Sequence, residues 1–179
     1  MSEQIISVHD KTFELFLTEN EIVKRVSEIA AELEAAYASK QPVMIGILNG
    51  AYPFLSDLSK QMKTELEISF MKATSYKGTK SSGEVNEILG LNTDIRGRHV
   101  LIVEDIVDTG NTLSFIREQL FKHDPLSLKI ASCFLKPGIF NKDYPLDWVG
   151  FEIADDFVIG YGMDYNGLGR NLQSVYKLK

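Results

Sequence analysis

Three acidic residues in the middle of the chain, Glu104, Asp105 and Asp108, are followed at once by a run of small polar residues. The run consists of Thr109, Gly110, Asn111 and Thr112. Carboxylates bind sugar hydroxyls or an oxygen-preferring cation such as Mg²⁺, whereas backbone N–H groups that converge at the start of a helix bind phosphate. The stretch therefore offers a carboxylate site beside a phosphate site, which a sugar phosphate would fill. The same residues are also consistent with a plain helix cap whose acids complement the helix dipole.

The elements that must position this stretch follow from the spacing of apolar residues. Apolar runs predict strands at residues 43–48, 66–73, 84–91, 100–103 and 127–135. Helices are predicted between strands or before them, the first after a capping box at Thr18 and a later one from near Asn111. This alternation is typical of an α/β fold, a Rossmann-like parallel sheet flanked by helices. Ligands of such sheets bind beyond the carboxyl ends of the strands, so we expect the chemistry at that edge.

From Trp148 onward the pattern changes to short strands and glycine turns. These residues do not alternate with helices, so we expect them to form a small β-rich hood beside the sheet. A length of 179 residues, with 44% hydrophobic and 25% charged residues, indicates one globular domain over residues 1–179.

The charge and the cysteine content exclude several classes of protein. A net charge of −6 provides no broad basic surface for a nucleic acid or an anionic membrane, so we expect neither partner. The single cysteine, Cys133, cannot form an intrachain disulfide, and its apolar neighbours predict that it is buried. The sequence shows no signal peptide and no apolar run long enough for a membrane span, which predicts a cytoplasmic protein.

Residues 100–113 resemble the phosphoribosyl-pyrophosphate motif of the type I phosphoribosyltransferases. Three further segments, at residues 48–51, 75–85 and 149–165, resemble the hypoxanthine-guanine phosphoribosyltransferases in that family. The resemblance covers most of the chain. It implies purine salvage: ribose 5-phosphate passes from phosphoribosyl pyrophosphate to N9 of hypoxanthine or guanine, which gives IMP or GMP and pyrophosphate. It also implies a Mg²⁺ cofactor and a homodimer or homotetramer.

The resemblance assigns roles to the acidic stretch. Glu104 and Asp105 meet the ribose hydroxyls, while the 5-phosphate is held by Asp108, Thr109, Gly110, Asn111 and Thr112. Asp108 is the general base, which takes a proton from the imidazole ring of the purine. The residues implied for the metal ion are Glu104, Asp105 and Asp164.

Two loops are assigned to the pyrophosphate and to the cover of the site. The resemblance implies a pyrophosphate loop of Leu48, Asn49 and Gly50, with a contact from Arg170. It also implies a cis peptide bond between Leu48 and Asn49. Many relatives carry a basic residue where this chain has Asn49, so a side-chain contribution at that position is in doubt.

Ser75 and Tyr76 begin a segment of glycine and hydroxyl residues, residues 75–83, which resembles a mobile lid over the active site. A lid of this kind would keep water away from a reactive cation. A passive surface loop is the alternative that the residues alone leave open.

The resemblance also assigns the residues that recognise the purine. Lys136 donates to the exocyclic O6, and Phe157 stacks on the base. Val158 offers backbone groups to the base, and Asp164, which is assigned to the metal, also helps to recognise the base. Without the resemblance, Lys136 and Arg170 are also consistent with surface residues, Phe157 with a core aromatic and Asp164 with a turn.

Two other functions remain open at this stage. One is a non-catalytic regulator that senses phosphoribosyl pyrophosphate, although the acidic charge and the presence of Asp108 and Lys136 count against it. The other is a transferase for another base such as xanthine, because Asp155 and Asp156 place an acidic pair near the expected base pocket.

Overall fold

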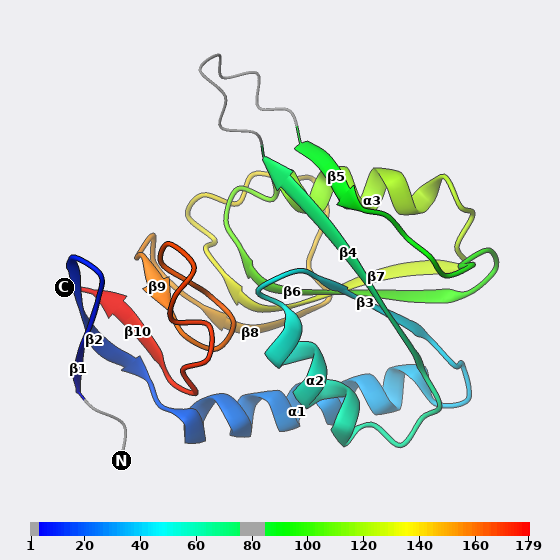
Figure 1. Cartoon of the computed structure of the whole chain (residues 1–179). Coiled ribbons are helices and arrows are strands. Elements are labelled where there is room, and N and C mark those ends of the chain that lie inside the picture. Colours follow the sequence, from blue (N-terminus) through cyan, green and yellow to red (C-terminus); the bar gives the residue numbers. More distant parts are fainter. Residues whose placement is uncertain (1–3, 76–84) are drawn as a thin grey trace.

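The computed structural model describes residues 4–75 and 85–179, and its larger sheet has six strands. In sheet order the strands are β5 (Val85–Leu89), β4 (Glu67–Ser75), β3 (Val43–Ile47), β6 (His99–Val107), β7 (Ser127–Leu135) and β8 (Trp148–Glu152). Neighbours from β4 to β8 are parallel, and β5 pairs with β4 in the antiparallel sense. The predicted parallel sheet is therefore confirmed (Figure 1).

Helices cover both faces of this sheet (Figure 1). The helices are α1 (Glu19–Tyr37), α2 (Tyr52–Gln61) and α3 (Asn111–Phe121). α1 and α2 pack with one apolar cluster, and α3 packs with another on the opposite face. The predicted capping box is present, because the Thr18 hydroxyl accepts from the Glu21 N–H while the Glu21 carboxylate accepts from the Thr18 N–H. Burial on both faces explains why the central strands are apolar.

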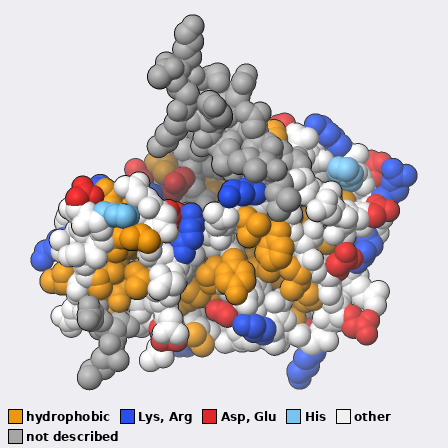
Figure 2. All heavy atoms as spheres, viewed as in Figure 1, with side chains coloured by type: hydrophobic (Ala, Val, Ile, Leu, Met, Phe, Trp, Pro, Cys, Tyr) orange, Lys and Arg blue, Asp and Glu red, His pale blue; other side chains and the backbone are white. Residues whose placement is uncertain are grey.

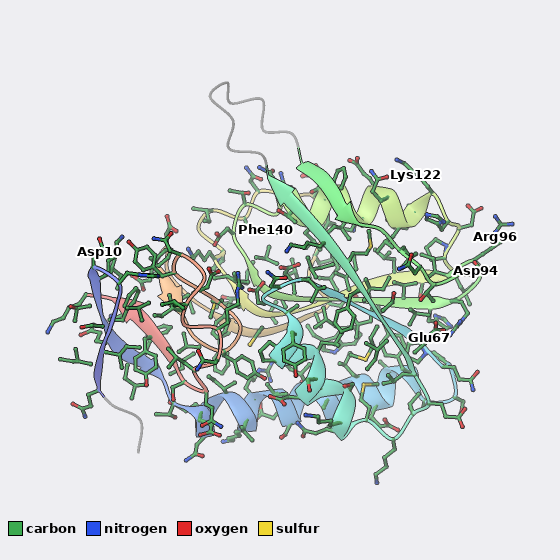
Figure 3. The ribbon with its side chains drawn as sticks, viewed as in Figure 1. Asp10, Glu67, Asp94, Arg96, Lys122 and Phe140 are labelled. Atoms are coloured by element: carbon green, nitrogen blue, oxygen red, sulfur yellow. The ribbon has the colours of Figure 1, made fainter. Side chains whose placement is uncertain are left out.

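The parallel register brings the functional segments to one edge of the sheet. β6 lies between β3 and β7, and its residue Val103 is paired with Gly46 on one side and Ala131 on the other. The carboxyl ends of these strands therefore open side by side, toward the hood in Figure 1. Glu67, Asp94 and Arg96 lie near the opposite end of the sheet (Figure 3).

The hood is a separate antiparallel sheet, and it differs from the prediction in two respects. Its strands, in order, are β1 (Ile5–Val8), β2 (Lys11–Leu17), β10 (Val175–Leu178) and β9 (Val158–Ile159). The prediction of a hood from the C-terminal residues is correct for β9 and β10, but it missed β1 and β2, which contribute half of the sheet. Phe13 and Leu15 alternate with the polar residues Thr12 and Glu14 in β2, and this period of two was the available signal. The prediction was wrong for Trp148–Glu152, which form β8 of the larger sheet because they pair in parallel with β7.

Cys133 is buried within β7, as predicted. No helix in the described part of the chain is long and apolar enough to cross a membrane.

Candidate active site

The two adjacent acids lie inside β6, because this strand continues past the predicted boundary to Val107. Burial, followed by the charge of Asp105, raises the pKa of the Glu104 carboxyl well above its ordinary value. Burial also raises the pKa of Asp105, although a hydrogen bond with Glu104 and the charge of Arg170 oppose this shift. A buried Oε2 atom of Glu104 has no hydrogen-bond partner among the described residues. Ionisation of the pair is thus disfavoured, and Glu104 keeps an acceptor atom without a partner among the described residues.

The loop after β3 lies directly against Asp105. A Cβ atom on Gly50 would overlap the Asp105 carboxylate, and a Cβ atom on Gly162 would overlap the Gly50 carbonyl oxygen. Only glycine, which has no Cβ, allows these three segments to pack this closely. The structure therefore brings the predicted pyrophosphate loop, the acidic pair and the segment after β9 together.

Arg170 and Asp164 close this side of the site. The Arg170 guanidinium donates to the Gly162 carbonyl oxygen at 2.7 Å and forms an ion pair with Asp164. Asp164 also accepts from the backbone N–H of Gly167 at 2.7 Å. Both residues are thus placed within reach of the Gly50 loop, and their charges compensate each other in this state.

The peptide bond between Leu48 and Asn49 is cis, in agreement with the prediction. The Asn49 side chain accepts from the ammonium of Lys72, with an Nζ–Oδ1 distance of 3.3 Å. Lys72 lies on β4, the strand beside β3, so the sequence could not connect it with this loop. It places a positive charge where Asn49 itself provides none.

The residues predicted to hold the 5-phosphate line a cavity of about 200 Å³ beyond the end of β6. Gly110 is the N-cap of α3, with a left-handed φ of 80°, and no acidic residue occupies the first turn of the helix. The Asn111 N–H makes only a long contact to Thr109 Oγ1, at 3.5 Å. The N–H groups of this turn can therefore bind an external anion, which the helix dipole also favours.

A segment that the sequence analysis missed packs against Gly110 and Asn111 from the loop after β7. The segment comprises Phe140, which is labelled in Figure 3, with Lys142 and Tyr144. The Lys142 ammonium donates to Asn111 Oδ1 at 2.6 Å, and the Tyr144 hydroxyl donates to the Gly110 carbonyl oxygen at 3.3 Å. These contacts hold the turn at the start of α3 in place.

Lys136 follows β7 directly and is 8% exposed. Its Nζ atom lies 3.1 Å from Asp108 Oδ1 and 3.1 Å from Asp155 Oδ1. Burial alone would lower the pKa of Lys136, but the hydrogen bonds with Asp155 and Asp108 outweigh it, and the pKa is raised. The structure thus joins the predicted base and the predicted O6 donor, together with an acid from a third segment.

Phe157 stands at the edge of the hood with 43% of its surface exposed. Its ring lies 6.2 Å from that of Phe13 and 5.8 Å from that of Tyr165, and the Lys11 ammonium is 5.7 Å from its centroid. Val158 follows as the first, buried residue of β9. The N-terminal hairpin therefore supports the aromatic ring predicted to stack on the purine.

The predicted lid is described in part. Ser75 is the last residue of β4 and pairs with Val85 of β5. Tyr76 and residues 77–83 lie outside the described residues.

Oxygen ligands for a metal ion are present, although they do not form a complete metal cage. Within residues 4–75 and 85–179, no group of three or more acidic, histidine or cysteine side chains is placed to hold a metal ion. Mg²⁺ commonly takes one or two carboxylates and completes its coordination with water and substrate phosphates. The unused Oε2 atom of Glu104 and the adjacent Asp105 fit that mode of binding.

Comparison with known proteins agrees with the geometry. A phosphoribosyl transferase domain model matches residues 15–166. The chain is similar to hypoxanthine-guanine phosphoribosyltransferase of Bacillus subtilis, with 45% identity over 166 residues and coverage of 92% of each chain. It is also similar to the crystal structure of a hypoxanthine phosphoribosyltransferase from Staphylococcus aureus. That comparison gives a TM-score of 0.88 and 43% identity, and it covers 93% of this chain and 91% of the other.

Some relatives are much longer. The chain is 40% identical over 174 residues to a protein of Listeria innocua named bifunctional protein TilS/HprT. The match covers 97% of this chain but 27% of that relative, so the chain spans about a quarter of its length.

Proposed function

This chain belongs to the phosphoribosyltransferase family, and we propose from that premise that it is a hypoxanthine-guanine phosphoribosyltransferase. It transfers ribose 5-phosphate from phosphoribosyl pyrophosphate to N9 of hypoxanthine or guanine, which gives IMP or GMP and pyrophosphate. The observation that carries this proposal is the meeting of Asp108, Lys136 and the phosphate cavity at one edge of the sheet. The match to the family over residues 15–166 supports one phosphoribosyltransferase domain over residues 1–179.

The phosphate end of the substrate is held by backbone groups. The N–H groups of the α3 N-terminus, with the Thr109 and Thr112 hydroxyls, bind the 5-phosphate, and Glu104 and Asp105 bind the ribose hydroxyls. Leaving-group departure places positive charge on the ribose ring, and the adjacent carboxylates stabilise that charge.

The pyrophosphate binds at the other end of the site. The loop of residues 48–50 offers backbone N–H groups, Arg170 offers a guanidinium, and Lys72 adds positive charge beside Asn49. The family works with a divalent metal ion, and we assign Mg²⁺ to Glu104, Asp105 and Asp164. When bound, the ion neutralises the pyrophosphate and eases its departure. Arg170 and Asp164 are paired with each other in this structure. Part of that ion pair must therefore break when Arg170 binds the pyrophosphate and Asp164 binds the metal ion.

The purine is recognised and deprotonated at the exposed end of the site. Lys136 donates to O6, which favours an oxo group over the amino group of adenine. Phe157 stacks on the ring, and Val158 contributes backbone groups. Asp108 removes the imidazole proton as N9 attacks the ribose carbon. Residues 75–83, with Ser75 and Tyr76, are the lid in this proposal.

We also assign a homodimer or homotetramer in the cytoplasm. A groove of about 670 Å³ between α1, α2 and residues 161–173 supports association, because Val23 and Tyr52 expose apolar surface along it. Figure 2 shows hydrophobic side chains gathered on this face, over α2. Asn49 and Arg170 also line the groove, so a neighbouring copy there would touch the pyrophosphate end of the site.

The test is a comparison of kcat/KM for hypoxanthine, guanine, xanthine and adenine with saturating phosphoribosyl pyrophosphate. We expect turnover of the first two, and little of adenine. A matched assay with excess chelator, followed by addition of Mg²⁺, should abolish and restore turnover. Full activity in excess chelator would contradict the assignment of a metal ion. Turnover of xanthine alone would show that the substrate is xanthine and not hypoxanthine or guanine. A protein that binds phosphoribosyl pyrophosphate but turns over none of the bases would be a sensor.

A further inference from the structure

Lys136 is held by two carboxylates, and the proposed mechanism uses one of them. The Nζ atom is equidistant from Asp108 and Asp155, at 3.1 Å from an Oδ1 atom of each. Lys136 is almost buried, whereas the side chains of Asp108 and Asp155 are 52% and 68% exposed. The lysine thus lies at the inner end of a small polar cluster that opens toward the expected purine.

We propose that Asp155 is a positioning residue for purine recognition, which holds the Lys136 ammonium so that its remaining N–H faces the purine O6. This inference rests on the proposed function of Lys136. It assigns a task to Asp155 that neither the sequence pattern nor the mechanism above requires.

The number of donors on the ammonium supports this arrangement. A lysine ammonium has three N–H donors and no acceptor. One donor is directed to Asp155 in a hydrogen bond, and the ion pair with Asp108 holds the ammonium from a second side, which restricts the direction of the remaining donors. With Asp108 as the single partner, the ammonium could rotate about that contact, and the direction of its other donors would not be fixed.

The proton transfer gives the second carboxylate a further purpose. When Asp108 accepts the proton from the purine ring, the electron pair of that N–H bond stays with the ring and Asp108 becomes neutral. Lys136 then loses the ionic attraction of this partner. Asp155 keeps its charge and holds the ammonium in position through the step.

The backbone places Asp155 independently of its own ion pair. The Ile153 N–H donates to the Leu135 carbonyl oxygen at 2.9 Å, and the Lys136 N–H donates to Val107 at 3.0 Å. After Asp155, Val158 pairs with Lys177 of β10. Both ends of the short loop are therefore fixed, and the loop carries both Asp155 and the stacking ring of Phe157.

Binding of two nucleotides tests the inference. IMP carries the O6 acceptor, and purine ribonucleoside 5′-monophosphate has hydrogen in its place. Dissociation constants for both would be measured with the wild type, Asp155→Ala and Asp156→Ala. Asp156 is the matched control, because it has the same charge on the same loop and, among the described residues, the ion pairs of Lys136 are with Asp108 and Asp155.

We expect Asp155→Ala to weaken IMP binding about fivefold, the scale of a partly exposed ion pair. Binding of the nucleotide without O6 should stay unchanged, as should both affinities in Asp156→Ala. In turnover, KM for hypoxanthine should rise while KM for phosphoribosyl pyrophosphate stays constant, and Asp155→Glu should restore part of the loss.

The outcomes separate this inference from the function on which it rests. If the wild type itself binds both nucleotides equally, the O6 contact of Lys136 is wrong. If the wild type prefers IMP but Asp155→Ala keeps that preference in full, the inference about Asp155 is overturned. Equal weakening for both nucleotides, or the same effect in Asp156→Ala, would also overturn it, because it would indicate general disturbance of the loop.

Discussion

The two ends of the candidate site are built in opposite ways. At the ribose and pyrophosphate end, Glu104 and Asp105 lie half-buried within a strand, and Gly50 and Gly162 pack too closely for any side chain. At the purine end, Asp108 and Phe157 are exposed. In the proposed mechanism, tight packing would hold the ribose and the pyrophosphate, whereas the proton transfer would occur on Asp108, which remains exposed to solvent. Each substitution below tests one side of this contrast.

The largest effect is expected at the exposed end. Asp108→Asn keeps the shape and an acceptor for Lys136 but removes the base, so kcat should fall about 10²- to 10⁴-fold. Affinity for phosphoribosyl pyrophosphate should survive, because backbone N–H groups provide most of the phosphate contacts. Single-turnover rates and equilibrium binding measure the two quantities separately. Near-normal kcat with weak phosphate binding would make Asp108 a structural cap of the turn.

At the packed end, Gly50→Ala should act through geometry. The added methyl group must displace the Asp105 carboxylate or the loop, and displacement of about 1 Å can cost about 100-fold in rate. We expect kcat/KM for phosphoribosyl pyrophosphate to fall on that scale. Gly138→Ala is the control, because a Cβ atom there meets nothing within 4 Å. Equal activity of the two variants would show that the packing at Gly50 is not required.

Removal of the O6 donor should give an intermediate effect. Lys136→Ala loses a charged hydrogen bond, worth about 1.5–3 kcal/mol, so kcat/KM for hypoxanthine should fall roughly 10- to 100-fold. Binding of phosphoribosyl pyrophosphate should change little. Lys129, which lies on the same strand and pairs with Asp147, provides the control variant Lys129→Ala. Unchanged kcat/KM for both bases would remove Lys136 from the site.

The smallest effect concerns stability. Because burial raises the pKa of Glu104, its ionisation is unfavourable in the folded protein, and wild-type stability is lost as pH rises above the unfolded pKa. Glu104→Gln removes that cost. The melting temperature of the variant, relative to the wild type, should increase as the pH rises above the ordinary pKa range of a glutamate carboxyl, measured without substrate.

The exposed Glu118 supplies the control Glu118→Gln, for which we expect no such trend. If the difference in melting temperature between Glu104→Gln and the wild type stays constant with pH, the Glu104 carboxyl does not have a raised pKa.

Sequence reasoning succeeded where neighbours in the chain are also neighbours in space. The apolar runs predicted the central strands, and the capping box at Thr18 predicted the start of α1. The end of β6 was placed too early, because Glu104 and Asp105 break the apolar pattern. Glu104 nevertheless pairs with Ser132 of β7, so the backbone continues the ladder beneath polar side chains.

The partners that act across the fold could not be predicted. Lys72 reaches Asn49 from the next strand, Lys142 reaches Asn111 from the loop after β7, and Asp155 reaches Lys136 from beyond β8. Each of these contacts depends on strand order and register. Strand order and register cannot be read from residue types and their spacing along the chain.

The hood joins the two ends of the chain, since Leu17 of β2 pairs with Val175 of β10 and Phe13 pairs with Leu178. During synthesis, β2 is made before the strands of the larger sheet, and its partner β10 is made after them. The sheet that holds the phosphate cavity contains local strand–helix units, whereas closure of the hood must span all of that sheet in the sequence. We therefore expect a nascent chain to acquire its phosphate-binding edge first, and to become able to select a purine only after β10 has been made.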